Sequence, residues 1–241
     1  MNQVRILCNL HDYNHPEINK VISMKKIWKE NGLSIVFFAM FLISLTGQFF
    51  TGWKDHNNDL EQDHQPPISL STYINSGHFI QATFENWESE FLQMGLFVIF
   101  AVSLRQKGSS ESKAIDKKEE VDREPNPRRK GAPWPVKKGG FILKIYNYSL
   151  SLAFTFLFIL SFVLHFYGSL KENNDDALHN NMPSLSAYEY FGNARFWFES
   201  LQNWQSEFLS VFAIVVLSIF LRQHGSPQSK PVDAADSDTG D

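Results

Sequence analysis

Hydrophobic residues are concentrated in four segments of the chain, and polar stretches separate these segments. Residues 33–53 and 150–170 each contain about 21 residues without a formally charged side chain, and Phe and Leu are frequent in both. An α-helix of this length rises roughly 30 Å, which matches the hydrocarbon core of a bilayer. Both segments are therefore predicted to be transmembrane helices.

The other two apolar segments are shorter and need the residues before them to cross a bilayer. Residues 91–104 and 208–221 each contain about 14 residues. That is roughly 21 Å of helix, a length that also suits a buried helix of a soluble protein. The preceding amphipathic residues lengthen each helix, and each follows a clear spanning segment. We therefore expect an all-α membrane protein with four transmembrane helices, at about residues 31–53, 79–105, 147–170 and 196–222.

The second and fourth of these helices carry a repeated sequence. The block NWESEFL at residues 86–92 returns 117 residues later as NWQSEFL at residues 203–209, and LRQKGS at 104–109 returns as LRQHGS at 221–226. Two matches at one offset, on either side of dissimilar apolar residues, indicate a duplicated unit. The predicted architecture is two tandem helical hairpins, with repeat unit 1 at residues 24–107 and repeat unit 2 at residues 141–225.

Three polar segments lie outside the repeat units. Residues 108–140 mix charges of both signs with four prolines, and such a composition does not bury enough apolar surface to fold alone. The acidic segment 226–241 is similar, so a disordered linker and a disordered tail are expected. Residues 1–23 contain no apolar core of a secretory signal. Met24 is a more natural start, and residues 1–23 are expected to be a disordered extension of doubtful origin.

The charges predict an orientation in the membrane. The net charge of −4 and the mean hydropathy of −0.24 would suit a soluble protein, because the polar segments mask the apolar ones. Lys and Arg are concentrated before the first helix and in the linker, whereas the loops inside the two hairpins are mainly acidic. The positive-inside rule then predicts cytoplasmic termini and a cytoplasmic linker. The lipid bilayer is the expected partner, and nucleic-acid binding is not expected.

Two carboxylates, Glu90 and Glu207, are shared by both copies of the repeated block. Each lies 15 residues before the arginine that ends its helix, or roughly 22 Å from the cytoplasmic end and inside the outer part of the bilayer. Glu88 is not shared, because its counterpart is Gln205. The neighbouring polar residues that complete the candidate site are Asn86, Ser89, Asn203 and Ser206.

The shared carboxylates have two interpretations. Ionisable groups inside a membrane are costly and often mark ion or proton paths, so Glu90 and Glu207 could line such a path. They could instead take part in polar contacts between helices that fix how the two halves dock. We favour the docking role.

Tryptophan and arginine near the ends of the repeated helices are predicted to be interfacial. Arg105 and Arg222 end their helices, where a cation offsets the helix dipole and meets the inner headgroups. Trp87 and Trp204 occupy equivalent positions in the repeated block, and tryptophan is enriched at membrane interfaces.

No catalytic, metal or cofactor site is expected. His64 and His179 lie near acids in the loops, but no HxxxH or HExxH spacing supports a metal site. His165, near the outer end of the third span, is expected to be a packed or interfacial histidine. Cys8 is the only cysteine, so no disulfide or thiolate site is expected.

Several blocks resemble a small bacterial membrane family of unknown function with four spans. These blocks are FENWESEF at residues 84–91, APWPV at 132–136, RFWFES at 195–200 and the two LRQ segments that begin at residues 104 and 221. The resemblance covers roughly residues 28–232. It implies a multi-pass protein of the bacterial inner (plasma) membrane and supplies no activity. We expect a non-enzymatic structural or partner-binding membrane protein that could form homo-oligomers. The alternative is a small ion or proton channel or transporter that uses Glu90 and Glu207.

Overall fold

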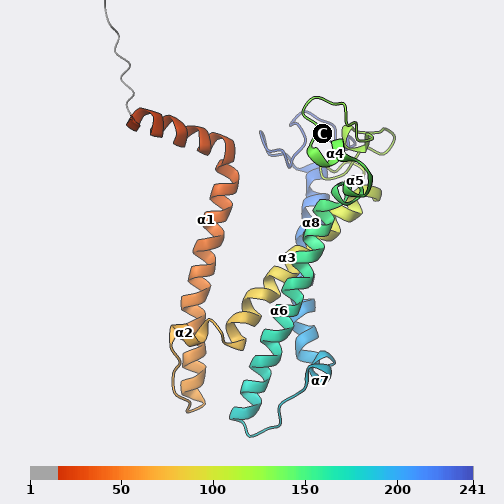
Figure 1. Ribbon diagram of the computed structural model, residues 1–241. Helices are drawn as coiled ribbons and strands as arrows, with labels where there is room; N and C mark the ends of the chain where they lie inside the picture. The colour runs from red at the N-terminus through yellow and green to blue at the C-terminus, as the bar shows by residue number, and fades with distance from the viewer. Residues whose placement is uncertain (1–15, 241) are drawn as a thin grey trace, which may run out of the picture. The chain divides into compact units, whose positions relative to one another are not determined.

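The computed structural model describes residues 16–240, with side chains from residue 24 onward. Helices and turns make up this part of the chain, and no strand occurs within it, so the all-α prediction is confirmed (Figure 1). Of the predicted extension at residues 1–23, residues 1–15 lie outside the described residues. The helices are α1 (Pro16–Gln62), α2 (Leu70–Tyr73), α3 (Gly77–Ser103), α4 (Trp134–Lys138), α5 (Gly140–Asn147), α6 (Ser149–His179), α7 (Ala187–Phe191) and α8 (Ala194–Phe220), with a 3-10 turn at Glu120–Asp122.

Each predicted transmembrane segment overlaps one long helix, but two of these helices continue further than the apolar sequence does. Helix α1 runs to Gln62 and α6 runs to His179, about nine residues past the predicted ends. The added residues, KDHNNDLEQ and KENNDDALH, are mostly polar. Apolar content therefore predicted the apolar part of each helix, and the helix itself continues into the polar sequence beyond it.

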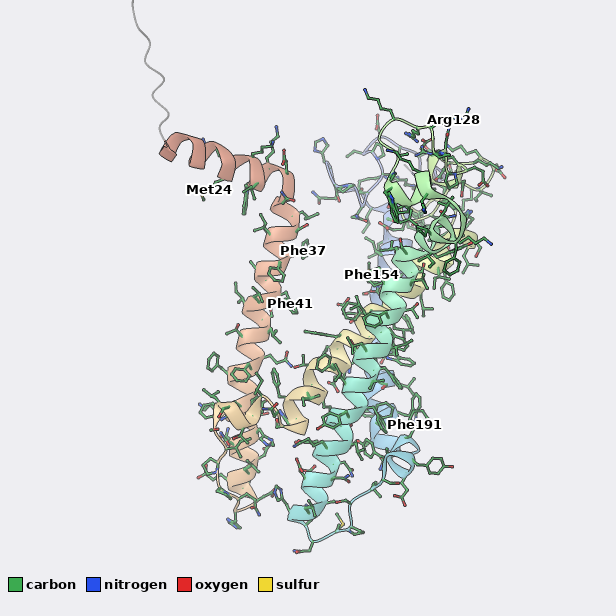
Figure 2. The ribbon with its side chains drawn as sticks, in the orientation of Figure 1. Met24, Phe37, Phe41, Arg128, Phe154 and Phe191 are labelled. Carbon is green, nitrogen blue, oxygen red and sulfur yellow. The ribbon has the colours of Figure 1, made fainter. Side chains whose placement is uncertain are left out.

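The described chain divides into two compact units, one ending at Pro67 and the other beginning at Ile68. In the first unit, α1 exposes large apolar side chains between Met24 and Phe50, including Phe37 and Phe41 (Figure 2). Residues 24–62 of this helix are long and apolar enough to cross a membrane. No residue of its most apolar 18-residue stretch is buried, which is the pattern expected of a helix in contact with lipid.

In the second unit, α6 packs closely against α3 in the antiparallel direction. Glycines permit the approach: a Cβ added to Gly77 would lie 2.3 Å from the backbone nitrogen of Glu172, and one added to Gly168 would lie 2.4 Å from that of Gln81. Small residues at a helix interface let the two backbones meet, a common device in membrane helices.

Helix α8 runs parallel to α3 and packs against it, and its aromatic side chains also contact those of α6. Phe162 lies 5.5 Å from Phe196 between ring centroids, and Phe158 lies 6.4 Å from Trp204. Both pairs are edge-to-face, the arrangement that aromatic rings favour. Helices α3, α6 and α8 therefore form one three-helix group in the second unit (Figure 1).

Helices α3 and α8 have the same length and begin with related caps. Each contains 27 residues, and their first residues, Gly77 and Ala194, are 117 positions apart. The side chains of Ser76 and Asn193 accept hydrogen bonds from backbone amides of the first turn, which satisfies donors that the helix itself leaves unpaired. The short helices before them, α2 and α7, are capped by Ser69 and Ser186, again 117 positions apart.

The C-terminal ends of α3 and α8 also have matching hydrogen bonds. Nη1 of Arg105 and Nη1 of Arg222 each donate to carbonyl oxygens of the last turn of their own helix. The amide of Gln106 donates to Ser112 Oγ at 2.9 Å, and the amide of Gln223 donates to Ser229 Oγ at the same distance. The two arginines thus satisfy carbonyls at both helix ends.

Three helices of the described chain are long and apolar enough to cross a membrane: α1, α6 and α8. Helix α3 is not among them, since Glu85, Glu88 and Glu90 interrupt its apolar sequence. Most large apolar side chains on α1, α6 and α8 are exposed. Exposed apolar area on this scale is a feature of membrane contact.

The linker and the C-terminal tail hold local turns and contact each other. The amide of Gly108 donates to Thr239 Oγ1 at 2.8 Å, and the amide of Gly240 donates to Ser109 O at 3.1 Å. Ser109 also hydrogen-bonds Ser218 at 3.0 Å, near the end of α8. The disorder expected for residues 108–140 and 226–241 stays a prediction.

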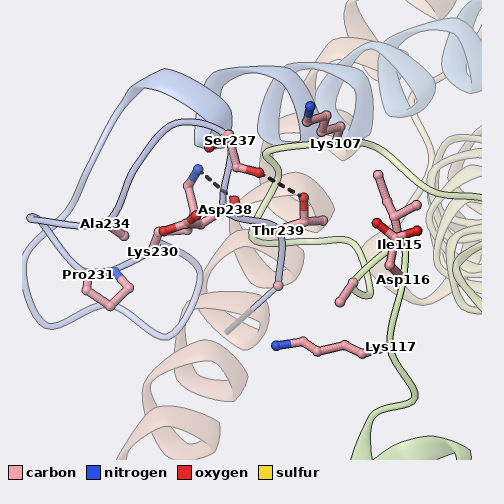
Figure 3. A pocket seen from close by; sticks show the side chains of 12 residues that line it. Lys107, Ile115, Asp116, Lys117, Lys230, Pro231, Ala234, Ser237, Asp238 and Thr239 are labelled. Atoms are coloured by element: carbon pink, nitrogen blue, oxygen red, sulfur yellow. Dashed lines mark hydrogen bonds between the residues drawn. The ribbon is translucent and has the colours of Figure 1, made fainter.

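Lys230 binds several carbonyl oxygens of the tail and lines a hollow between the linker and the tail (Figure 3). Lys230 is almost fully buried, and its Nζ donates to the backbone oxygens of Ala235, Asp236 and Asp238 at 3.0–3.1 Å. Burial lowers the pKa of Lys230. The three carbonyls surround the ammonium group as they would surround a small cation.

We expect Lys230→Met to loosen the tail. The methionine leaves three carbonyl oxygens without their donor, and each unsatisfied buried polar group costs about 1–3 kcal/mol. Amide hydrogen exchange of residues 230–240 should become at least about tenfold faster. Lys117→Met is the matched control, because Lys117 lines the same hollow but is exposed (Figure 3). Equal exchange in both variants would contradict the role given to Lys230.

Candidate cation site between α3, α6 and α8

The buried side chains of the three-helix group are mostly polar, in contrast to its apolar exterior. They come from all three helices, and several lie at one level along the bundle. They are Thr83, Glu88, Ser89, Ser161, His165, Ser169, Glu172, Ser200 and Ser218. This distribution is the opposite of that in a soluble protein, whose interior is mainly apolar. The ionisable residues of the interior are therefore the candidates for a functional site.

His165 of α6 and Glu88 of α3 form a fully buried pair at the centre of this group. His165 Nδ1 lies 2.7 Å from Glu88 Oε2, and both side chains are 0% exposed. Trp204 of α8 donates from Nε1 to the other oxygen, Glu88 Oε1, at 2.8 Å. An ionised carboxylate only accepts hydrogen bonds, so Nδ1 of His165 carries the proton that it shares with Glu88. One carboxylate therefore joins all three helices.

The opposite nitrogen of His165 faces two further carboxylates. Nε2 lies 3.9 Å from Glu85 Oε2 on α3 and 3.6 Å from Glu199 Oε2 on α8. Both separations exceed a hydrogen bond, and this buried nitrogen has no hydrogen-bond partner among residues 16–240. Because buried polar atoms are rarely left unpaired, this one calls for an explanation.

Glu199 is held in place by neighbours from α6, α7 and its own helix. Ser169 Oγ donates to Glu199 Oε2 at 2.7 Å, and Arg195 Nε donates to Glu199 Oε1 at 3.0 Å. Tyr190 OH lies 2.6 Å from Ser169 Oγ, and burial raises the pKa of Tyr190. The neutral phenol thus donates to the serine, which in turn donates to the carboxylate.

Aromatic rings close one side of the cluster. Phe196 is fully buried, and its ring centroid lies 5.1 Å from that of His165. Phe162 and Phe166 pack against Phe196 at 5.5 and 5.2 Å. These rings exclude water from the histidine, so electrostatic interactions inside the cluster are stronger than they would be in solvent. We call Glu85, Glu88, His165 and Glu199 the buried cluster.

The carboxylates chosen from the sequence lie outside the buried cluster. Glu90 is exposed and Glu207 is half-buried, and the two interact electrostatically with each other. The structure brings this pair near each other without burying it, and its predicted role stays a prediction.

The four neighbouring polar residues bond to the backbone of their own helices. Asn86 donates to Ala82 O, Ser89 to Asn86 O, Asn203 to Glu199 O and Ser206 to Asn203 O. Ser89 is buried, Asn203 half-buried, and the other two are exposed. Asn203 also interacts with the carboxylate of Glu85 on α3, which is a contact between helices.

The residues predicted to be interfacial differ in their surroundings. Trp87 packs edge-to-face on Phe84 with ring centroids 5.1 Å apart, whereas Trp204 donates to Glu88 inside the group. Within residues 16–240, Arg105 donates hydrogen bonds to carbonyl oxygens at the end of its own helix. Arg222 also donates to Ala234 O and Asp236 in the tail. Matching positions 117 residues apart thus have different partners.

Sequence reasoning did not select the residues of the buried cluster. It set Glu88 aside because its counterpart is Gln205, and it treated His165 as a packed or interfacial histidine. His165 is indeed buried, yet it lies within the uncharged segment 150–170, and an ionisable residue in such a segment of a membrane protein is a functional-site candidate by default. That signal was present in the sequence, whereas the identity of its partners was not.

A family model described as a domain of unknown function (DUF6766) matches residues 24–241. The chain belongs to this family. No curated protein and no solved structure matches the chain. The DUF6766 match includes α3, α6, α8 and the whole buried cluster, and it brings no activity with it.

Proposed function

We propose that this DUF6766 protein is a non-enzymatic, four-span protein of the bacterial inner membrane, built from two tandem hairpins. The duplication is supported by α3 and α8, which have related N-caps, equal lengths and matching C-terminal hydrogen bonds at an offset of 117 residues. Each of these helices reaches roughly 40 Å, which is enough to cross a bilayer even with polar residues at its outer end. The three apolar helices α1, α6 and α8 would be joined by α3 as the fourth span.

The proposed orientation places both termini and the linker in the cytoplasm. The support is the clustering of Lys and Arg in the linker and before the first span, which follows the positive-inside rule. Glu88 then lies 15 residues from the end of α3 at Ser103, roughly 22 Å above the cytoplasmic boundary. The buried cluster would thus sit in the outer part of the hydrocarbon layer.

Within this architecture, we propose that the protein is a small ion transporter or channel that binds a cation at the buried cluster. The observation that carries the proposal is the fully buried His165–Glu88 pair with Glu85 and Glu199 beside it. Three carboxylates face one histidine and one arginine, so the cluster favours a positive ligand. Ionisable groups in a membrane are expensive, and those that persist commonly mark ion pathways.

A structural role is the second candidate, and a specific observation favours it. Glu88 accepts hydrogen bonds from both α6 and α8, so the cluster ties the three helices together. Polar contacts of this kind hold membrane helices against each other without any transport. Such a protein would act by organising the membrane or by binding partners, including further copies of itself.

Flux through proteoliposomes distinguishes the two candidates. Uptake of Na⁺, K⁺, Mg²⁺ and Zn²⁺ would be followed for the full chain and for Glu85→Gln, a substitution of nearly equal volume. We expect uptake of one cation to fall at least about tenfold in Glu85→Gln, because the amide loses the Coulomb attraction of the carboxylate. The double variant Glu90→Gln with Glu207→Gln is the control and should retain uptake.

Other outcomes decide against the transport proposal. If the full chain carries none of these cations, the structural role stands instead. If the double variant loses uptake and Glu85→Gln keeps it, the site is the shared carboxylate pair and not the buried cluster.

A further inference from the structure

We propose that Glu85, His165 and Glu199 bind a divalent transition-metal cation, with Zn²⁺ as the first member to test. This inference rests on the proposed function and deepens it, because it names the class of cation that the site takes. The three side chains come from α3, α6 and α8, and one ligand atom of each lies within 4.8 Å of the other two.

The separations fit a metal ion bound between the three side chains. Zinc lies about 2.0–2.2 Å from nitrogen and oxygen ligands in tetrahedral geometry, so two ligand atoms on one ion are roughly 3.3–3.6 Å apart. His165 Nε2 is 3.6 Å from Glu199 Oε2 and 3.9 Å from Glu85 Oε2. The third side, between the carboxylate oxygens of Glu85 and Glu199, is within 4.8 Å, so the half-buried Glu85 must move inward for all three atoms to reach one ion.

The contact with Glu88 orients His165 as a ligand. In the neutral imidazole, donation from Nδ1 to Glu88 Oε2 at 2.7 Å places the lone pair on Nε2, and metal binding requires this neutral form. Nε2 is buried and has no hydrogen-bond partner in the described part of the chain, and it faces the two carboxylates. A carboxylate on the far nitrogen of a metal-bound histidine is the usual arrangement, because it fixes the ring and raises its basicity.

Outer hydrogen bonds also prepare the carboxylate of Glu199. Ser169 and Arg195 each donate to one of its oxygens, and a carboxylate oxygen has a second lone pair for a metal. Ligating carboxylates in proteins are commonly supported in this way. Glu85 interacts with the side chains of Asn203 and Gln81.

The ligand set selects the class of metal. One imidazole nitrogen and two carboxylate oxygens suit Zn²⁺ and neighbouring transition metals, whereas Mg²⁺ and Ca²⁺ prefer oxygen ligands throughout. Two carboxylates neutralise a dication. Three protein ligands leave a fourth position open, as in sites that exchange a ligand and unlike closed structural sites.

Zinc binding to the full chain in detergent tests the inference. Calorimetric titration with ZnCl₂ should give one site per chain, and Mg²⁺ at the same concentration should not compete. Glu85→Gln and His165→Asn should each weaken binding by at least about tenfold, and Glu88→Gln by about 10–100-fold through the histidine. Glu90→Gln, an exposed glutamate two residues further along α3, should bind as the unmodified chain does.

Each remaining outcome counts against a specific claim. Equal zinc binding in Glu85→Gln and His165→Asn, or none in the full chain, overturns the metal site. If His165→Asn does not fold, Glu85→Gln and zinc-edge X-ray absorption still decide, because the site requires one nitrogen and at least two oxygen neighbours. Cation uptake without zinc binding overturns the metal site and leaves the proposed transport standing. Zinc binding without uptake of any cation overturns the proposed transport and leaves the metal site standing.

Discussion

Gly168→Ala is expected to lower the free energy of unfolding by about 2 kcal/mol, within the range measured for overpacked interiors. The new Cβ would lie 2.4 Å from the backbone nitrogen of Gln81 and 2.8 Å from a side-chain carbon of Ile80. The neighbouring backbone cannot move away as a flexible side chain can, so α3 and α6 must separate. This cost exceeds the gain of up to about 1 kcal/mol that alanine brings over glycine in a helix.

Thermal or denaturant unfolding in detergent measures the effect, and Gly47→Ala is the matched control. Gly47 also lies inside a long apolar helix, but a Cβ there would meet nothing within 4 Å. We expect the control to be neutral or slightly stabilising. If both variants unfold alike, the close approach of α3 and α6 at Gly168 is wrong.

Glu88→Ala is expected to cost about 3 kcal/mol or more, because removing one partner of a buried pair leaves the other uncompensated. Nδ1 of His165 and Nε1 of Trp204 would both lose their acceptor. Each of these donors is inside the helix group, where an unsatisfied polar group costs about 1–3 kcal/mol. The loss should therefore exceed that of an ordinary surface substitution several-fold.

The same unfolding measurement on Glu90→Ala supplies the contrast. Glu90 is two residues away and exposed, so its removal should change stability by about 0.5 kcal/mol or less. Combining Glu88→Ala with His165→Ala should cost less than the sum of the two single variants, since the pair is then removed together. Additive costs, or a larger loss in Glu90→Ala, would contradict the buried pair.

The helices of this protein follow from local sequence, because their signals act over short distances. Uncharged segments of about 21 residues predict spans at 33–53 and 150–170, and α1 and α6 contain them. The repeated block predicted that α3 and α8 would be alike, and both contain 27 residues with related caps and exits.

The buried cluster could not be predicted in the same way, because its members come from different helices. A comparison of the two repeated blocks selects the carboxylates that occur in both, which are Glu90 and Glu207. The cluster instead uses residues whose counterparts differ: Glu88 is buried, whereas its counterpart Gln205 is exposed. A duplicated sequence can diverge at the positions where its two copies take different roles.

The sequence by itself determined which segments are helical, which are apolar enough for a membrane, and which blocks recur 117 residues apart, since each depends on residue type and spacing along the chain. Only the tertiary structure decided which carboxylates are buried. The antiparallel packing of α3 on α6 through Gly77 and Gly168 sets the register that brings Glu88 to His165, and α8 then adds Glu199 and Trp204. Register depends on how two backbones approach each other, and no single segment of sequence contains that information.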